Sequence, residues 1–93
     1  MKMNKADLVE LIANKIGSSK KQTEESVNLL LSTIQKSVAR GEKVTLVGFG
    51  TFARRERKPR RGRNPKTGEE INIPSKKVPA FSAGKEFKSK VNK

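Results

Sequence analysis

The chain has 93 residues, the length of one small domain, and its 22 Lys and Arg against nine Asp and Glu give a formal net charge of +13. This excess favours a polyanionic partner: DNA, RNA or an acidic membrane surface. The absence of Cys and His excludes disulfides, the usual zinc sites and catalysis by Cys or His. No two carboxylates suggest a catalytic pair, so we expect no enzymatic activity, no metal and no cofactor.

The N-terminal segment indicates the cellular location of the protein. It has a charge every few residues and lacks the apolar run of a signal peptide. No stretch of the sequence approaches the roughly 18 apolar residues of a membrane span. We therefore expect a soluble, cytoplasmic protein.

The first part of the chain predicts a hairpin of two helices over about residues 4–40. Asn4 can cap the first helix, with Asp7 in its first turn. Ser19 followed by Gln22 fits a capping box at the start of the second helix. Apolar residues recur in both segments at spacings of three and four, which indicates one apolar face on each helix.

After the helices, the periodicity changes to that of a sheet, which we expect over about residues 42–81. Residues 43–47 are β-branched and short, the glycine-flanked phenylalanine at 48–50 suggests a tight turn, and a strand then resumes. Ser82 can cap a last short helix over about residues 83–91. The order α-α-β-β-(arm)-β-α indicates a single α+β domain over residues 1–93. Without the arm its core is modest, which favours an intertwined homodimer.

The expected arm covers about residues 54–77 and is the most basic part of the sequence. Residues 54–68 carry eight basic side chains and one acidic side chain, a net charge of +7. A charge run of this kind is ordinarily a solvated or disordered loop. The turn-forming sequence 64–68, and Ile71 and Ile73 after it, instead favour a two-stranded ribbon with its tip near Pro65.

Four arginines of the arm share one parity and would line one face of a strand: Arg55, Arg57, Arg61 and Arg63. A bulge at Pro59 would shift that register. Strands of ten residues would reach roughly 33 Å at about 3.3 Å each, and such a ribbon should be mobile until it binds. Its arginines could enter a minor groove, where Pro65, otherwise a turn former, could insert between base pairs.

Three motifs in this order, Val44–Phe52, Gly62–Gly68 and Val78–Lys85, resemble the HU/IHF family of bacterial histone-like proteins, a standard example of minor-groove DNA benders. The resemblance covers nearly the whole chain. It implies an intertwined homodimer with a helical body and two β-ribbon arms, in which Pro65 intercalates and kinks the DNA. Because a kink costs less in such DNA, we expect a preference for bent, nicked or flexible duplexes. It also implies a nucleoid-associated protein that condenses DNA with little sequence specificity.

The resemblance assigns roles to individual residues. The arm contacts it implies are Pro65, Asn64, Arg63, Arg60, Arg57, Arg55, Ile71 and Ile73, to which we add three further cations of the arm, Arg61, Lys66 and Lys77. The phosphate contacts of the body are Lys5, Lys20, Lys85 and Lys88, and the phenylalanines of the dimer core are Phe49, Phe52 and Phe81. Asn28 stands where some relatives carry an acid that pairs with the lysine matching Lys5, which leaves Lys5 available to phosphate.

Several alternatives remain open at this stage. Sequence-specific architectural binding, as in IHF, is one, and a basic structural protein that coats RNA is another. Residues 47–52 superficially resemble the RNP1 pattern of an RNA-binding module, but Val47 replaces the expected cation and Thr51 an aromatic residue. A membrane-surface protein would need a basic amphipathic helix, whereas the charge here concentrates on the expected ribbon.

Overall fold

The computed structural model describes residues 2–92 and has an α+β fold. The chain forms two compact units, the first ending at Lys36 and the second beginning at Ser37. The single domain expected over residues 1–93 extends beyond the described residues at both ends and stays a prediction. Within residues 2–92, no helix has the length and apolar character needed to cross a membrane.

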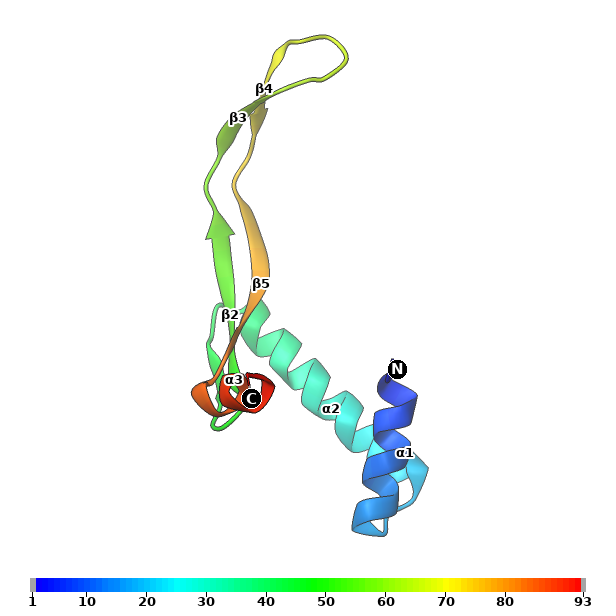
Figure 1. Cartoon of the computed structure of the whole chain (residues 1–93). Helices are drawn as coiled ribbons and strands as arrows, with labels where there is room; N and C mark the ends of the chain where they lie inside the picture. The colour runs from blue at the N-terminus through cyan, green and yellow to red at the C-terminus, as the bar shows by residue number, and fades with distance from the viewer. Residues whose placement is uncertain (1, 93) are drawn as a thin grey trace. The chain divides into compact units, whose positions relative to one another are not determined.

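The first unit is a helical hairpin made of α1 (Lys5–Ile16) and the greater part of α2 (Lys20–Ala39) (Figure 1). The start of α1 is closed by a reciprocal capping box: Asn4 Oδ1 accepts from the Asp7 N–H at 2.9 Å, and the Asp7 carboxylate accepts from the Asn4 N–H at 3.1 Å. This box satisfies two of the N–H groups that a helix start otherwise leaves unpaired.

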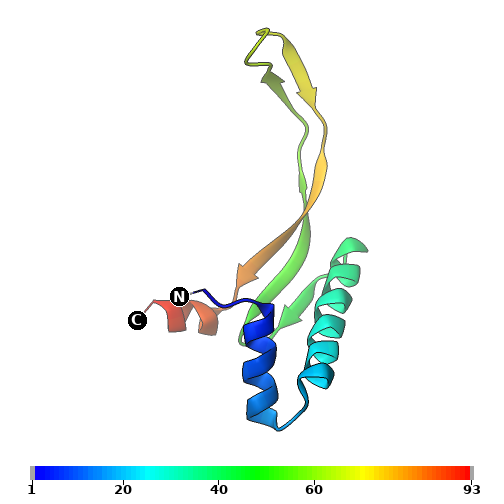
Figure 2. The ribbon, with the colours of Figure 1, turned by 90° about the vertical axis from the view of Figure 1, so that its right-hand side faces the viewer.

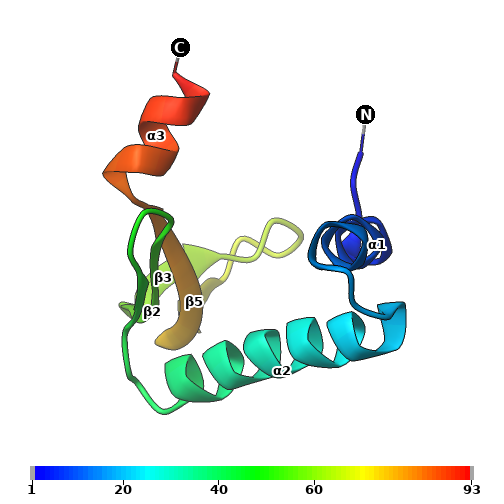
Figure 3. The same ribbon diagram turned by 90° about the horizontal axis from the view of Figure 1, so that it is seen from below.

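A short turn joins the two helices, which lie beside one another in Figures 2 and 3. Gly17 ends α1 in the left-handed region, at φ 70°. Ser19 Oγ accepts from the Gln22 N–H at 3.1 Å, which is the predicted cap of α2. The Gln22 side chain, however, accepts from the Ser18 hydroxyl at 3.2 Å, so the second capping box is present only in part.

The second unit is built on antiparallel strands. A three-stranded sheet has the order β1-β2-β5, and a two-stranded ribbon, β3-β4, continues beyond it (Figure 1). The strands are β1 (Val44–Leu46), β2 (Gly50–Arg57), β3 (Arg60–Arg63), β4 (Glu70–Ile73) and β5 (Lys76–Ala83), and the final helix is α3 (Lys85–Val91).

The predicted cap of the last helix is wrong. Ser82 lies within β5, opposite Thr51, because the pairing of β2 with β5 continues as far as Ala83. The helix α3 therefore begins only at Lys85, and its N-cap is Gly84, which offers no side-chain hydrogen bond. Ladder pairing across two strands thus prevails over a local capping preference, and α3 is shorter than the predicted helix.

The core of the described chain is thin. The buried hydrophobic residues are Val9, Ala13 and Val38. Large apolar side chains remain exposed in both units: Met3, Leu8, Leu11, Ile12, Ile16, Leu29, Leu30, Leu31, Val47, Phe49, Ile71, Phe81 and Val91. A single copy therefore leaves much apolar surface in contact with water, which is unfavourable by about 25 cal/mol per Å².

Four phenylalanines gather at the base of the second unit. The ring centroids of Phe52 and Phe81 lie 4.8 Å apart, and those of Phe49 and Phe81 lie 5.3 Å apart. Phe87 of α3, which is not among the dimer-core phenylalanines implied by the resemblance, lies 5.1 Å from Phe49. Such tilted arrangements are favourable for aromatic pairs, and the cluster joins α3 to the sheet.

Gly50 is required by this packing. A Cβ at this position would lie 2.6 Å from the Phe81 ring and 2.6 Å from the carbonyl oxygen of Ser82. Backbone at this distance cannot move without disturbing the β2–β5 pairing. By contrast, a Cβ at Gly62 in β3 would lie 3.1 Å from Cδ1 of Ile73, the movable end of a side chain.

We therefore predict that Gly50→Ala destabilises the protein by about 1–3 kcal/mol, the usual cost of overpacking. The matched variant Gly62→Ala should cost less than about 1 kcal/mol, because the Ile73 side chain can shift. Urea unfolding followed by circular dichroism at one fixed protein concentration measures both variants. Equal losses for the two variants would contradict the steric role of Gly50.

Candidate nucleic-acid interface

The basic arm is one antiparallel ribbon with a single register. β2 and β5 pair from Gly50 with Ala83 to Arg57 with Lys76. β3 and β4 resume the pairing with Arg60 opposite Ile73. Two residues separate the paired positions on each strand, so neither strand contains an inserted residue. The bulge considered at Pro59 does not occur, and the register of the arm is not shifted.

The ribbon is nevertheless interrupted halfway along its length. By the same register, Pro59 on one strand stands opposite Pro74 on the other, and strand pairing stops on both sides of them. Proline has no N–H to donate to a ladder. The sequence predicted arm strands of ten residues, and this prediction is wrong because both strands are interrupted at these prolines. A hollow opens here, lined by Arg57, Lys58, Arg60, Ile73, Pro74, Ser75 and Lys76.

The tip of the arm is a turn that hydrogen-bonds to itself. The Asn64 N–H donates to the Glu69 carbonyl at 2.8 Å, and the Asn64 carbonyl accepts from the Gly68 N–H at 2.8 Å. Gly68 has φ 75°, a conformation that glycine adopts without strain. The Asn64 side chain accepts from the Lys66 N–H at 2.9 Å, which encloses Pro65 in an Asx turn. Local bonds thus hold Pro65 within the turn.

The pairing of β3 with β4 sorts the distal side chains onto two faces, because directly opposed residues share a face. Arg60 and Gly62 oppose the isoleucines of β4, Ile73 and Ile71 respectively. Arg61 and Arg63 lie on the other face, opposite Asn72 and Glu70. The isoleucines predicted to contact a ligand therefore share a face with Arg60, not with Arg61 and Arg63.

The cations of the arm are all exposed to solvent. Arg61 Nη1 lies 3.8 Å from a carboxylate oxygen of Glu70, in a pair whose side chains are both more than half exposed. Exposed pairs of this kind contribute little stability. Lys77 opposes Glu56 in the β2–β5 pairing. The net charge of the ribbon therefore remains strongly positive along its length.

The predicted body lysines have different surroundings. Lys5 Nζ donates to Asn28 Oδ1 at 2.7 Å, so Lys5 is not unpartnered, but its partner is neutral and leaves its charge uncompensated. Lys20 lies 3.6 Å from Glu10, in an exposed ion pair. Lys85 and Lys88 are exposed on α3.

No group of three or more acidic side chains within residues 2–92 is placed to hold a metal ion. The chemistry available along this surface is that of guanidinium and ammonium groups, the turn at Pro65 and the two isoleucines.

Comparison with known proteins identifies what this arrangement is similar to. The family model described as "Bacterial DNA-binding protein" matches residues 3–92. The DNA-binding protein HU of Clostridium pasteurianum is 54% identical over 91 residues, which cover 98% of this chain and all of that protein.

Solved structures agree with this similarity. The cocrystal structure of Anabaena HU with DNA superposes with a TM-score of 0.89 at 55% identity, over 96% of this chain and 97% of that chain. HU from Thermotoga maritima superposes with a TM-score of 0.67 at 35% identity, over 96% and 98% of the two chains.

The paired prolines generate a prediction about the free protein. Replacing both, as Pro59→Ala with Pro74→Ala, restores two backbone donors, and the ladder should then continue through the break. Amide hydrogen exchange of the flanking residues 57, 58, 60, 73, 75 and 76 should become at least several-fold slower. Pro79→Ala is the matched control, because Pro79 lies in the paired part of β5, opposite Arg54. Unchanged exchange in the double variant would show that the prolines do not cause the break.

Proposed function

The chain belongs to the HU family of bacterial DNA-binding proteins, and we propose that it binds double-stranded DNA in the minor groove and bends it. Membership of this family makes it a DNA-binding protein and not an enzyme. In the proposed mode, binding shows little sequence preference, and the protein acts as a histone-like component of the nucleoid in the cytoplasm.

The observation that carries the proposal is the tip of the arm. Pro65 is held in a compact turn at the end of a ribbon that is rich in exposed arginines. A proline ring is apolar, flat-sided and free of an N–H that insertion would leave unpaired. Insertion of such a wedge between base pairs costs a few kcal/mol of stacking, which contacts along the bent DNA can offset.

The arm's arginines support binding in the minor groove. Negative potential concentrates in a narrow minor groove and attracts guanidinium groups. In this mode, Arg55, Arg57 and Arg63 hold the phosphates and walls of the groove, together with the cations Arg60, Arg61, Lys66 and Lys77. The side-chain oxygen Oδ1 of Asn64 accepts a hydrogen bond within the turn, which leaves the side-chain N–H groups to donate to base edges or sugars. Ile71 and Ile73 lie on the face of Arg60 and provide apolar contact beside the wedge.

A second copy of the chain is the natural cover for the exposed apolar surface. Phe49 and Phe81 are each more than 40% exposed, although their rings belong to the aromatic cluster with Phe52. An intertwined homodimer would bury these rings and the apolar helix faces. Two arms would then reach the same duplex, which allows one protein to introduce two kinks.

The body lysines would extend the contact along the flanks of the DNA. Lys5 would exchange its neutral partner Asn28 for a phosphate without breaking an ion pair. Lys20 would first have to leave Glu10, although an exposed pair costs little to break. Lys85 and Lys88 present further exposed charges on α3. These contacts favour extensive wrapping.

Sequence-specific binding, as in IHF, is the second mode to be distinguished. The minor groove displays a degenerate pattern that mainly separates A·T from G·C pairs, which disfavours specific readout by this arm. RNA coating is the third mode. The minor groove of an RNA duplex is wide and shallow, so it does not enclose a β-ribbon as a DNA minor groove would.

The energetic cost of kinking DNA predicts which duplexes the protein prefers. A nicked duplex has already lost stacking continuity at one step, so we expect the protein to bind it at least about tenfold more tightly than the intact duplex, a difference of about 1.4 kcal/mol. Gel shifts with intact, nicked and RNA duplexes of one length measure these affinities. Equal affinity for intact and nicked DNA contradicts the kinking mode, and preference for RNA supports the coating alternative.

The wedge prediction concerns Pro65 itself. Pro65→Ala should reduce the bend while the protein still binds, because the arginines and lysines that supply most of the affinity remain. Fluorescence energy transfer between dyes at the two ends of a duplex reports the bend, and titration of the same duplex reports the affinity. Lys66→Ala serves as the control, since it alters a neighbouring charge but keeps the wedge. A bend equal to that of the unmodified protein would rule out intercalation by Pro65.

A further inference from the structure

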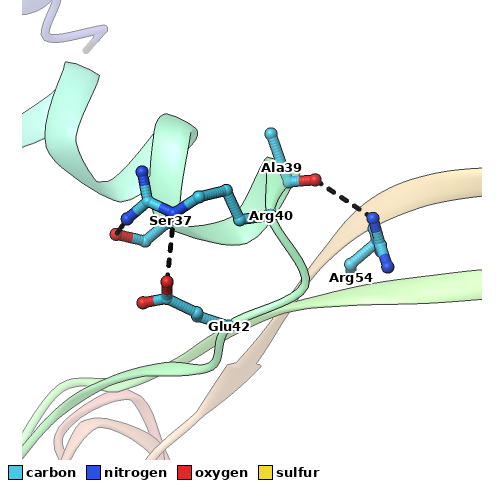
Figure 4. Close-up of polar contacts among 5 residues, drawn as sticks. All are labelled: Ser37, Ala39, Arg40, Glu42 and Arg54. Carbon is cyan, nitrogen blue, oxygen red and sulfur yellow. Dashed lines mark hydrogen bonds and ion pairs between the residues drawn. The ribbon is translucent and has the colours of Figure 1, made fainter.

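The C-terminus of α2 closes with a Schellman motif, and Figure 4 shows the residues around it. Gly41 has φ 91°, its N–H donates to the Val38 carbonyl at 2.9 Å, and the Glu42 N–H donates to the Ser37 carbonyl at 3.0 Å. These two bonds satisfy two of the last carbonyls of the helix. The carbonyl of Ala39, in the last residue of α2, receives neither of them.

A side chain from the arm binds that carbonyl. Arg54 Nη1 donates to the Ala39 carbonyl oxygen at 3.0 Å, from fifteen residues further along the chain (Figure 4). The guanidinium group also lies directly over Gly41, since a Cβ at that position would be 2.9 Å from Arg54 Nη2. Gly41 thus provides the left-handed turn and the space that the guanidinium occupies.

This contact is electrostatically favourable as well as geometrically specific. The C-terminal end of a helix carries partial negative charge, and a cation placed there typically contributes 0.3–1 kcal/mol, which is the order expected for an exposed site. The neighbouring Arg40 does not compete for the Ala39 carbonyl, because its Nε donates to Glu42 at 3.0 Å (Figure 4). Arg54 is therefore the residue that links β2 to the end of α2.

Arg54 differs in this respect from the other arginines of the arm. Successive residues of a strand point to opposite faces, so Arg54 and Arg55 project in opposite directions from β2. In the pairing with β5, Arg54 lies opposite Pro79 and Arg55 lies opposite Val78. The first charge of the basic run thus points to the helix, and the next points away from that contact.

We propose that Arg54 is a positioning residue that fixes the base of the arm to the C-terminal turn of α2, and that it does not contact DNA. The proposal rests on the proposed function, since it assigns a role within the DNA-gripping arm. With this contact in place, the arm bends more readily at the level of Pro59 and Pro74, where the ladder stops, than at Arg54. The contact therefore limits the directions in which the arm can extend toward the DNA.

The first test counts phosphate contacts. The logarithm of the dissociation constant varies linearly with the logarithm of salt concentration, and the loss of one phosphate contact lowers the slope by about 1. Arg54→Gln should leave this slope unchanged, whereas the adjacent Arg55→Gln should lower it by about 1. A slope that falls by about 1 in Arg54→Gln overturns the proposal.

The second test needs no DNA and reports the position of the arm. Because the sequence has no cysteine, nitroxide labels can be attached at Lys36→Cys on α2 and Lys76→Cys on the arm. Dilution with unlabelled chain restricts the measurement to pairs within one copy. Double electron–electron resonance measures the distribution of distances between the two labels. Arg54→Gln should broaden this distribution, and Arg54→Lys, which keeps the charge but loses the planar guanidinium, should broaden it less. An unchanged distribution in Arg54→Gln overturns the proposal.

The two tests also separate this proposal from the function on which it rests. If the unmodified protein fails to bend or bind DNA, the proposed function fails while the distance measurement still tests Arg54. If the unmodified protein binds DNA and Arg54→Gln changes the salt slope but not the distances, the proposed function stands and the positioning role fails. Arg54→Lys keeps the comparison usable if the glutamine variant does not fold.

Discussion

The register between the two long strands of the second unit governs the arrangement of the arm. It begins at Gly50 and Ala83 beside the phenylalanines and holds without an inserted residue to Arg63 and Glu70 below the tip. That constancy brings two prolines to one level, places the isoleucines of β4 on the face of Arg60 and leaves Pro65 at the turn. A slip of one residue would move every side chain of the arm to the opposite face.

Local signals made much of this predictable from sequence. Asn4 and Asp7 cap a helix through bonds between neighbours, and the turn at 64–68 closes through its own side chains, so composition and spacing suffice for both. Long-range effects were not predictable in the same way. Ser82 looked like a helix cap because the pairing that extends β5 depends on a strand some thirty residues earlier.

The arm shows the same division between local and distant causes. Arginine parity indicated a ribbon, but the break at Pro59 becomes visible only once Pro74 is known to stand opposite it. Arg54 was indistinguishable in sequence from the other cations of its run, since its partner is a helix carbonyl fifteen residues away. The position of Asn28 near Lys5 followed only from the family resemblance, and the hydrogen bond between them depends on packing between the two helices.

The interruption at Pro59 and Pro74 also bears on the fate of a damaged chain. Proteases that cut after basic residues have several exposed targets between Arg60 and Lys66. Such a cut would let β3 separate from β4. The separation would stop at Pro59 and Pro74, where the ladder is already interrupted, so β2 and β5 would stay paired. A clipped copy would keep its sheet, its aromatic cluster and its α3 while losing the continuous turn that encloses Pro65.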